Sequence, residues 1–199
     1  AVLLAESAEK TAIEKEALAG LVQRHVDGFV ILPVGQVHEH ITGLYHQGRA
    51  VVIIDRFFTD TDIPFVTSDN YGGAVEAIDY MIECGHRDIA CIQGFPYALP
   101  TIERVRGYRD ALGRADLPVR EEWIVGDSYS EENGYLETKL LLKETILPTA
   151  LFAMGNLISL GALRAIKEEK LSIPHDISMI SFDDQPYSNF LATPMTTVS

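Results

Sequence analysis

The sequence predicts an α/β fold with two lobes, each built on a doubly wound parallel sheet, and a ligand cleft between the lobes. Short apolar runs typical of buried strands alternate with helical patterns of about ten or more residues along the chain. Strands separated by helices imply right-handed crossovers, which place parallel strands side by side. A loop containing Pro96 and Pro100 interrupts the alternation, so we expect the chain to cross between lobes there.

The first half of the chain combines strand-like apolar runs with helix patterns that glycines can end. Ile13, Ala17 and Leu21 recur at the helical period, and Gly48 and Gly85 are placed to stop two later helices. In chain order the expected elements are a strand at 2–5, a helix at 11–25, a strand at 29–32, a helix at 39–47, strands at 51–54 and 65–68, a helix at 71–84 and a strand at 89–93.

The second half repeats this alternation. The run 177–181 has the apolar continuity of a parallel strand covered on both faces. It is the last of a series: a helix at 101–115, a strand at 123–125, a helix at 130–143, a strand at 150–153, a helix at 157–170 and the strand at 177–181. The extended segment 191–198, broken by Pro194, indicates a second crossing. We therefore expect a first lobe at 1–94, a second lobe at 95–191, and a return to the first lobe at 192–199.

Composition limits the possible functions. The chain has 199 residues, of which 47% are hydrophobic, enough for one large core or two modest ones. Its net charge of −13 argues against direct binding of a phosphate backbone, so any DNA contact must come from residues outside this segment. No apolar run approaches the roughly 20 residues that span a bilayer, and we expect a cytoplasmic protein without membrane contact.

Several possible chemical sites lack their necessary partners. Cys84 and Cys91 match no zinc or redox spacing, so we expect free thiols in a reducing compartment. The His38-Glu39-His40 run has no third ligand at a recognisable spacing, and no metal is expected. The sequence has no phosphate-binding loop, dinucleotide glycine fingerprint or nucleophile elbow, so we expect neither a cofactor nor an enzyme.

Polar residues follow several of the predicted strands, where open α/β sheets bind ligands. Asp183 lies beyond the strand at 177–181, and its carboxylate could accept hydrogen bonds from adjacent hydroxyls or instead stabilise the loop. Asn156 and Asp69 each follow a strand and open a helix, so each could contact a ligand or cap its helix. Ser7, just beyond the run 2–5, is a weaker candidate.

Arg104 lies early in the helix at 101–115, where a guanidinium could donate parallel hydrogen bonds to a ligand. Alternatively, it could be a solvated arginine paired with a neighbouring carboxylate. The sequence also leaves two possibilities open for Asp55-Arg56, a ligand contact or a structural ion pair, and for Phe57-Phe58, a pocket wall or packing between lobes.

The amino-acid sequences of several segments resemble the effector-binding domain of the LacI/GalR family of transcriptional regulators. The run I-P-H-D-I-S-M-I-S-F-D-D at 173–184 carries the likeness most clearly, followed by T-P-M-T-T-V at 193–198. Similar segments occur in the family's order at 26–31, 52–56, 83–90 and 103–108, so the resemblance covers essentially the whole chain.

The resemblance implies a two-lobed domain of the periplasmic-binding-protein type I fold that dimerises and works with a helix-turn-helix headpiece absent from this chain. It also implies that the first strand and helix and the last elements of the domain lie outside residues 1–199, so this fragment alone would be unstable. The implied effector is a small sugar or sugar derivative. By position in the family pattern, Tyr129 would stack on the effector, although it could instead be a core or rim tyrosine. The full set of expected effector-binding residues is Ser7, Asp69, Arg104, Tyr129, Asn156 and Asp183.

Two other classes remain as alternatives. A secreted or periplasmic sugar-binding receptor of a transport system would share the two-lobed fold. It would carry a signal peptide and no headpiece. A catalytic α/β domain is the third possibility, although the pair Asp183-Asp184 has neither a nucleophile nor a metal beside it in the sequence.

Overall fold

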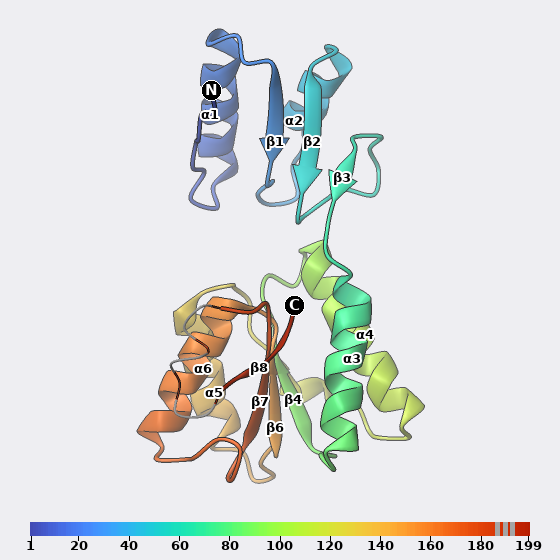
Figure 1. Ribbon diagram of the computed structural model, residues 1–199, viewed down its shortest axis with the longest axis vertical. Coiled ribbons are helices and arrows are strands. Elements are labelled where there is room, and N and C mark those ends of the chain that lie inside the picture. The colour runs from blue at the N-terminus through green and yellow to red at the C-terminus, as the bar shows by residue number, and fades with distance from the viewer. Residues whose placement is uncertain (186–187, 189–190, 192–193) are drawn as a thin grey trace. The chain divides into compact units, whose positions relative to one another are not determined.

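The computed structural model describes residues 1–185, 188, 191 and 194–199, and they form two compact units, Ala1–Ser68 and Asp69–Ser199 (Figure 1). The division falls earlier in the chain than the expected boundary at 94/95. Each unit has its own parallel sheet and its own core.

The first unit contains α1 (Thr11–Gln23), β1 (Gly28–Ile31), α2 (Glu39–His46), β2 (Ala50–Ile54) and β3 (Phe65–Val66). The strands are parallel and lie in the order β1-β2-β3. Both helices pack on one face of this sheet, where Leu18, Phe29, Ile41 and Ile53 are buried together.

The opposite face of the first sheet is bare within this unit. Val30 on β1 is 72% exposed and Val66 on β3 is 66% exposed. Apolar side chains on a parallel sheet are normally covered on both faces. The expected doubly wound arrangement is therefore only half built in residues 1–68.

The expected strand at 2–5 is wrong. Residues 1–6 have no strand pairing, and Val2 and Leu4 are 86% and 95% exposed. An isolated apolar run has no hydrogen-bond ladder until another strand lies beside it, and β1 pairs with β2 rather than with this segment.

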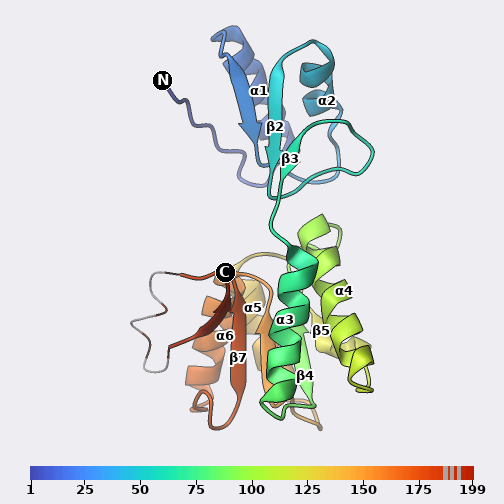
Figure 2. The same ribbon diagram turned by 45° about the vertical axis from the view of Figure 1, so that its right-hand side comes forward.

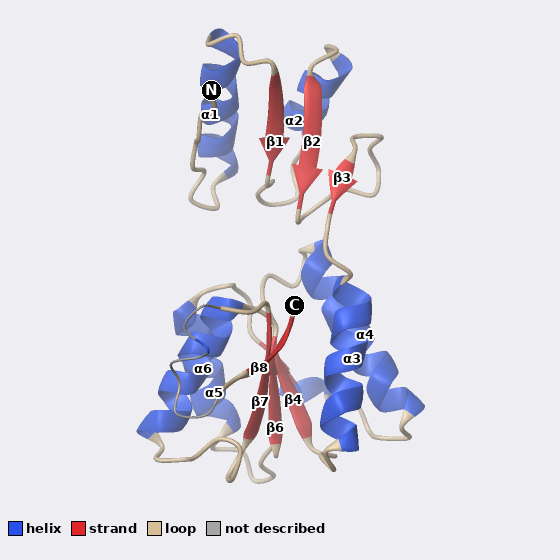
Figure 3. Ribbon diagram, in the orientation of Figure 1, coloured by secondary structure: helices blue, strands red, loops and turns tan. Residues whose placement is uncertain are grey.

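The second unit contains α3 (Asn70–Glu83), β4 (Ile89–Ile92), α4 (Leu99–Arg114), a 3-10 turn (Glu121–Trp123), β5 (Ile124–Val125), α5 (Glu131–Leu141), β6 (Ala150–Ala153), α6 (Asn156–Glu168), β7 (Ser178–Phe182) and β8 (Thr196–Val198). Its sheet has five parallel strands in the order β5-β4-β6-β7-β8. Figure 3 shows β4, β6 and β7 side by side.

Helices cover both faces of this second sheet, as predicted. On one face, Ile78 of α3 and Tyr108 of α4 pack with Phe152 of β6. On the other face, Ile158 of α6 packs with Leu151, the neighbour of Phe152 on the same strand. Alternate residues of one strand thus enter opposite cores, which is the pattern of a doubly wound sheet. Figure 2 shows α3 and α4 together on one side of the sheet.

Two segments expected in the first lobe belong to this second sheet. Strand β4 lies between β5 and β6, and all of its residues are buried, so this strand and α3 before it cannot be part of the first core. Thr196–Val198 was expected to return to the first lobe, yet it pairs in parallel with β7 as strand β8. Of the expected return segment, residues 192 and 193 lie outside the described residues.

Helices α5 and α6 meet at two glycines. A Cβ atom built on Gly134 would lie 2.0 Å from the carbonyl oxygen of Ile158, and one on Gly161 would lie 2.0 Å from the carbonyl oxygen of Glu131. No side chain fits in this contact, so the backbones of the two helices touch directly. Among the helices that the structure describes, none is long and apolar enough to span a bilayer.

Candidate functional site

The carboxyl ends of β4, β6 and β7 gather most of the predicted effector-binding residues. Gly94, Met154 and Asp183 lie just beyond these strands, which are neighbours in the sheet. This edge of an open parallel sheet is where α/β proteins bind ligands. The site described below belongs to the second unit alone.

Arg104 is buried at this edge, with 5% of its surface exposed. Its Nε donates to Oδ1 of Asn70 at 2.8 Å, and an Nη donates to the Met154 carbonyl at 2.7 Å. The guanidinium also stacks over the Phe182 ring, 3.6 Å from its centroid. Arg104 is therefore not the solvated helix arginine of the alternative interpretation. It joins α3, β6 and β7 at the predicted site.

Asp69 and Asn156 both lie at helix starts. The carboxylate of Asp69 accepts the Gly72 amide hydrogen at 2.8 Å as the N-cap of α3, so the capping role weighed for Asp69 is present. Asn156 is the first residue of α6, after the N-cap Gly155, and its Oδ1 accepts the Leu157 amide at 2.6 Å. Asp69 directly precedes Asn70, and Asn156 lies two residues after Met154, so both are close in sequence to residues that bind Arg104.

Tyr129 packs closely against backbone at the ends of β4 and β6. A Cβ atom on Gly94 would lie 2.3 Å from the Tyr129 ring, and one on Gly155 would lie 3.3 Å from it. The phenol oxygen is 2.6 Å from Oγ1 of Thr101, which is almost fully buried. Phe95 meets the ring edge-on at 5.7 Å between centroids. Together these residues form an aromatic wall at the site.

Asp183 lies at the end of β7 with its side chain exposed. Its backbone has φ of 70°, a left-handed conformation that aspartate tolerates better than most residues, and its amide donates to the Val198 carbonyl at 3.0 Å. The neighbouring Asp184 instead accepts the Gln185 amide through its carboxylate at 2.8 Å. The side chain of Asp184 thus bonds the loop backbone.

Ser7 belongs to the first unit, and its carbonyl accepts the Lys10 amide in a turn at 2.9 Å. Arg56 holds this turn, because its guanidinium forms paired 2.8 Å hydrogen bonds with the Glu9 carboxylate. The nearer ion-pair partner of Arg56 is thus Glu9, whereas Asp55 lies 3.9 Å away. Ser7 is not placed relative to the residues of the second unit.

The histidines of the His38-Glu39-His40 run bind carboxylates. His38 Nε2 lies 3.2 Å from Asp60, and His40 Nε2 lies 2.5 Å from Glu14, a buried residue. The Glu14 carboxylate also accepts the Val34 amide at 2.9 Å. In the described part of the chain, no group of three or more His, Cys, Asp or Glu side chains is placed to bind a metal ion.

Phe57 and Phe58 contact other rings of the first unit. Phe57 stacks on Phe65 with centroids 4.2 Å apart, and Phe58 lies 4.3 Å from the His38 ring. Both cysteines are free, as predicted, and burial raises the pKa of the Cys91 thiol, which keeps it protonated.

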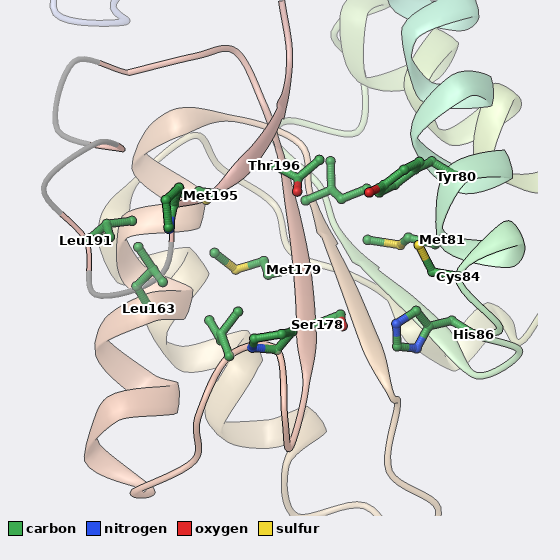
Figure 4. A pocket seen from close by; sticks show the side chains of 14 residues that line it. Tyr80, Met81, Cys84, His86, Leu163, Ser178, Met179, Leu191, Met195 and Thr196 are labelled. Atoms are coloured by element: carbon green, nitrogen blue, oxygen red, sulfur yellow. The ribbon is translucent and has the colours of Figure 1, made fainter.

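A groove of about 250 Å³ lies away from this edge, beside the amino-terminal half of β7 (Figure 4). Strand β8 pairs with β7 only from Ile180 onward, so among the described residues Met179 has no strand neighbour on that side. Leu163, Met195 and Met81 line the groove, and His86 lies at its edge. Partial burial lowers the pKa of His86, whose Nδ1 lies 3.0 Å from the Thr149 hydroxyl.

Four further residues support the site and were not predicted from the sequence. These are Asn70, Thr101, Asn133 and Phe182, all buried. The position of Phe182 at the end of the strand that leads to Asp183 was a usable signal for its place at this edge. Asn70 bonds Arg104, 34 residues away, and Asn133 bonds the Gln93 carbonyl, 40 residues away, so no local pattern reveals these two contacts.

The chain matches known proteins over nearly its full length. A family model described as a periplasmic binding protein-like domain matches residues 78–199, more than half of the chain. The transcriptional repressor PurR of Actinobacillus pleuropneumoniae is 32% identical over 89% of this chain and 53% of its own length. Catabolite control protein A of Priestia megaterium is 28% identical over 99% of this chain and 60% of its own length. The chain thus spans about half the length of these relatives.

Solved structures agree with this assignment. A candidate ribose operon repressor of Burkholderia thailandensis is 32% identical, with a TM-score of 0.89 over 99% of this chain and 73% of that one. A regulatory protein of the LacI family from Chloroflexus aggregans is 28% identical, with a TM-score of 0.82 over 98% of this chain and 69% of that one.

PurR and the Burkholderia protein are named as repressors and the Chloroflexus protein as a regulatory protein, which supports the regulator over the transport receptor and the enzyme. The periplasmic-binding-protein-like fold inferred from the sequence is confirmed by the sheets and by the matching structures. The chain belongs to the LacI/GalR family of transcriptional regulators, and it carries the family's periplasmic-binding-protein-like domain.

Proposed function

We propose that this chain senses a small polar effector, a sugar or sugar derivative, for a regulator that binds operator DNA. The observation that carries the proposal is the convergence of Arg104, Tyr129, Asn156 and Asp183 at one edge of the second sheet. This edge combines charged and amide groups with an aromatic wall. The proposal includes Asp69 beside them and Ser7 from the first unit.

The chemistry of this edge suits a polyol. An exposed carboxylate such as Asp183 can accept hydrogen bonds from two adjacent hydroxyls, and an aromatic ring such as Tyr129 can cover the apolar face of a sugar ring. The naming of one relative as a ribose operon repressor is consistent with an effector of this class.

The proposed signal is a change in operator affinity. A ligand that binds one conformation better than another shifts the population between them. A coupling free energy of about 1–3 kcal/mol would change the affinity for operator DNA roughly 5- to 150-fold. We propose that the DNA contact lies on a headpiece outside this chain, because the net charge of −13 argues against direct binding of DNA by this segment.

We also propose that the regulator is a cytoplasmic homodimer. The apolar groove lined by Leu163 and Met195 offers surface for association.

The test uses the natural full-length protein and DNA selected by that protein from a random library. D-ribose, D-glucose, D-galactose and D-fructose are added in turn, and the operator dissociation constant is measured. The first expected outcome is that at least one of these sugars changes operator affinity by fivefold or more in the unaltered protein. Asp183→Asn should then abolish this response while leaving operator affinity without sugar unchanged.

Asp184→Asn is the matched control, since it makes the same change one residue away at a carboxylate that bonds the loop backbone. It should keep the sugar response. An equal loss in both variants, or a normal response in Asp183→Asn, would remove Asp183 from the site. Absence of any selected DNA would reject the regulator itself.

A further inference from the structure

The loop that carries Tyr129 is fastened by a buried asparagine of helix α5. Asn133 is 7% exposed. Its Nδ2 donates to the Gln93 carbonyl at 3.0 Å and to the Ser128 carbonyl at 2.6 Å, while its Oδ1 accepts the Asp127 amide at 3.2 Å. One side-chain amide therefore ties the end of β4 to the loop that follows β5.

The loop has little freedom to move away from this amide. Gly126 has φ of 100°, and a Cβ atom there would lie 2.7 Å from the Gln93 carbonyl oxygen and 2.9 Å from Nδ2 of Asn133. Gln93 returns a bond through its Nε2 to the Gly126 carbonyl at 3.1 Å. The loop backbone is thus held from two sides by side-chain amides, and its tight turn requires glycine.

The element that carries Asn133 is itself fixed. Asn133 receives an N-terminal cap, because its amide donates to the Ser130 hydroxyl at 3.1 Å. The next residue, Gly134, meets the backbone of α6 directly. A side chain on a rigid helix start can hold a loop more accurately than a side chain on another loop.

The held loop ends at Tyr129, the aromatic residue of the proposed site. Its ring lies flat against Gly94 and its phenol oxygen is bonded to Thr101. We infer that Asn133 is a positioning residue that holds Tyr129 in its binding orientation before any effector arrives. Such preorganisation removes part of the entropy cost of ligand binding. The inference rests on the proposed function for its purpose, but the positioning itself can be tested without a ligand.

The experiment is 19F NMR on the full-length protein carrying 3-fluorotyrosine, with the Tyr129 signal assigned by its disappearance in Tyr129→Phe. We expect Asn133→Ala to shift and broaden the Tyr129 resonance, because the loop loses its amide bridge. The Tyr108 resonance should stay in place, since this ring is buried in the other core and donates to the Ile89 carbonyl.

Two controls separate positioning from a general loss of stability. Thr138→Ala removes a fully buried hydroxyl from the same helix, away from the loop, and Glu132→Ala changes an exposed neighbour of Asn133. Both should leave the Tyr129 signal unchanged. An unchanged signal in Asn133→Ala, or an equal change in Thr138→Ala, would overturn the inference. Failure of the sugar response described above would instead reject the proposed effector and leave this result standing.

Discussion

At the scale of single residues, this protein places buried polar side chains where loops must be held. Arg104, Asn133 and Glu14 are each at least nine-tenths buried, and each bonds to backbone groups of distant segments. A buried polar group without partners would be costly, so these side chains are stable only with their loops in place. The loops in turn depend on them.

Glu14 gives a direct test of this dependence. Glu14→Ala removes the acceptor of the Val34 amide and the partner of His40, and we expect a loss of about 1–3 kcal/mol in local stability. Hydrogen exchange of the Val34 amide in the full-length protein measures it. Glu16→Ala, an exposed change on the same helix, should leave that exchange rate unaltered. Equal exchange rates of the Val34 amide in the two variants would show that Glu14 does not stabilise this segment.

The candidate site could be predicted in part at this scale. Asn156 and Asp183 were predicted because residues after strands of a parallel sheet meet at one edge, and Arg104 because it lies early in the helix at 101–115. The structure places all three at this edge. Their effector contacts remain proposals. Asn133 was missed because, in sequence, it is an ordinary polar residue near a helix start. Its contact with the Gln93 carbonyl exists only in the folded chain.

At the scale of elements, the strongest constraint is the contact of α5 with α6. The carbonyl oxygens of Glu131 and Ile158 occupy the space that side chains at Gly161 and Gly134 would need. Both cores of the second unit are closed by helices, and one of them depends on this crossing. The close approach also fixes the helix start that carries Asn133.

The contact between α5 and α6 predicts that alanine substitutions at two helical glycines change the stability in opposite directions. Gly161→Ala should destabilise the full-length protein by about 3 kcal/mol, because the new methyl group forces the helices apart. Gly113→Ala is the matched control in a helix, with no atom near the new methyl group, and it should stabilise by about 0.5–1 kcal/mol. Urea unfolding followed by circular dichroism gives both values. A near-neutral Gly161→Ala would show that the helices can separate without cost.

Strands were predicted correctly where an apolar run lies in a sheet that is covered on both faces. The runs at 89–93, 150–153 and 177–181 became β4, β6 and β7 with shifts of about one residue at their ends. The run at 2–5 has the same apolar pattern but forms no strand. A strand forms only where a second strand pairs with it, and the sequence does not show which segments pair. For the same reason β4 was assigned to the wrong sheet.

At the scale of the whole chain, the two units differ in how much of each sheet the described residues cover. The second has a sheet covered on both faces, whereas the first leaves Val30 and Val66 exposed on one face of its sheet. A parallel sheet with a bare apolar face has lost much of the burial that stabilises it. The alternation of helices and strands along the sequence could not predict this difference, because it does not show on which face of the sheet each helix packs.

We therefore expect the two units to behave differently when they are made separately. Residues 69–199 should give dispersed amide signals in NMR and unfold cooperatively, while residues 1–68 should give the narrow dispersion of an unfolded or molten chain. The measurement compares the amide dispersion in the NMR spectra of the two fragments at one temperature. A well-dispersed spectrum from residues 1–68 would show that a single covered face is enough.

The bare face of the first sheet has a consequence for residues 1–199 studied on their own. Val30 and Val66 expose apolar surface on this face. Apolar surface of this kind favours association, so concentrated solutions of this segment should contain oligomers that form through this face.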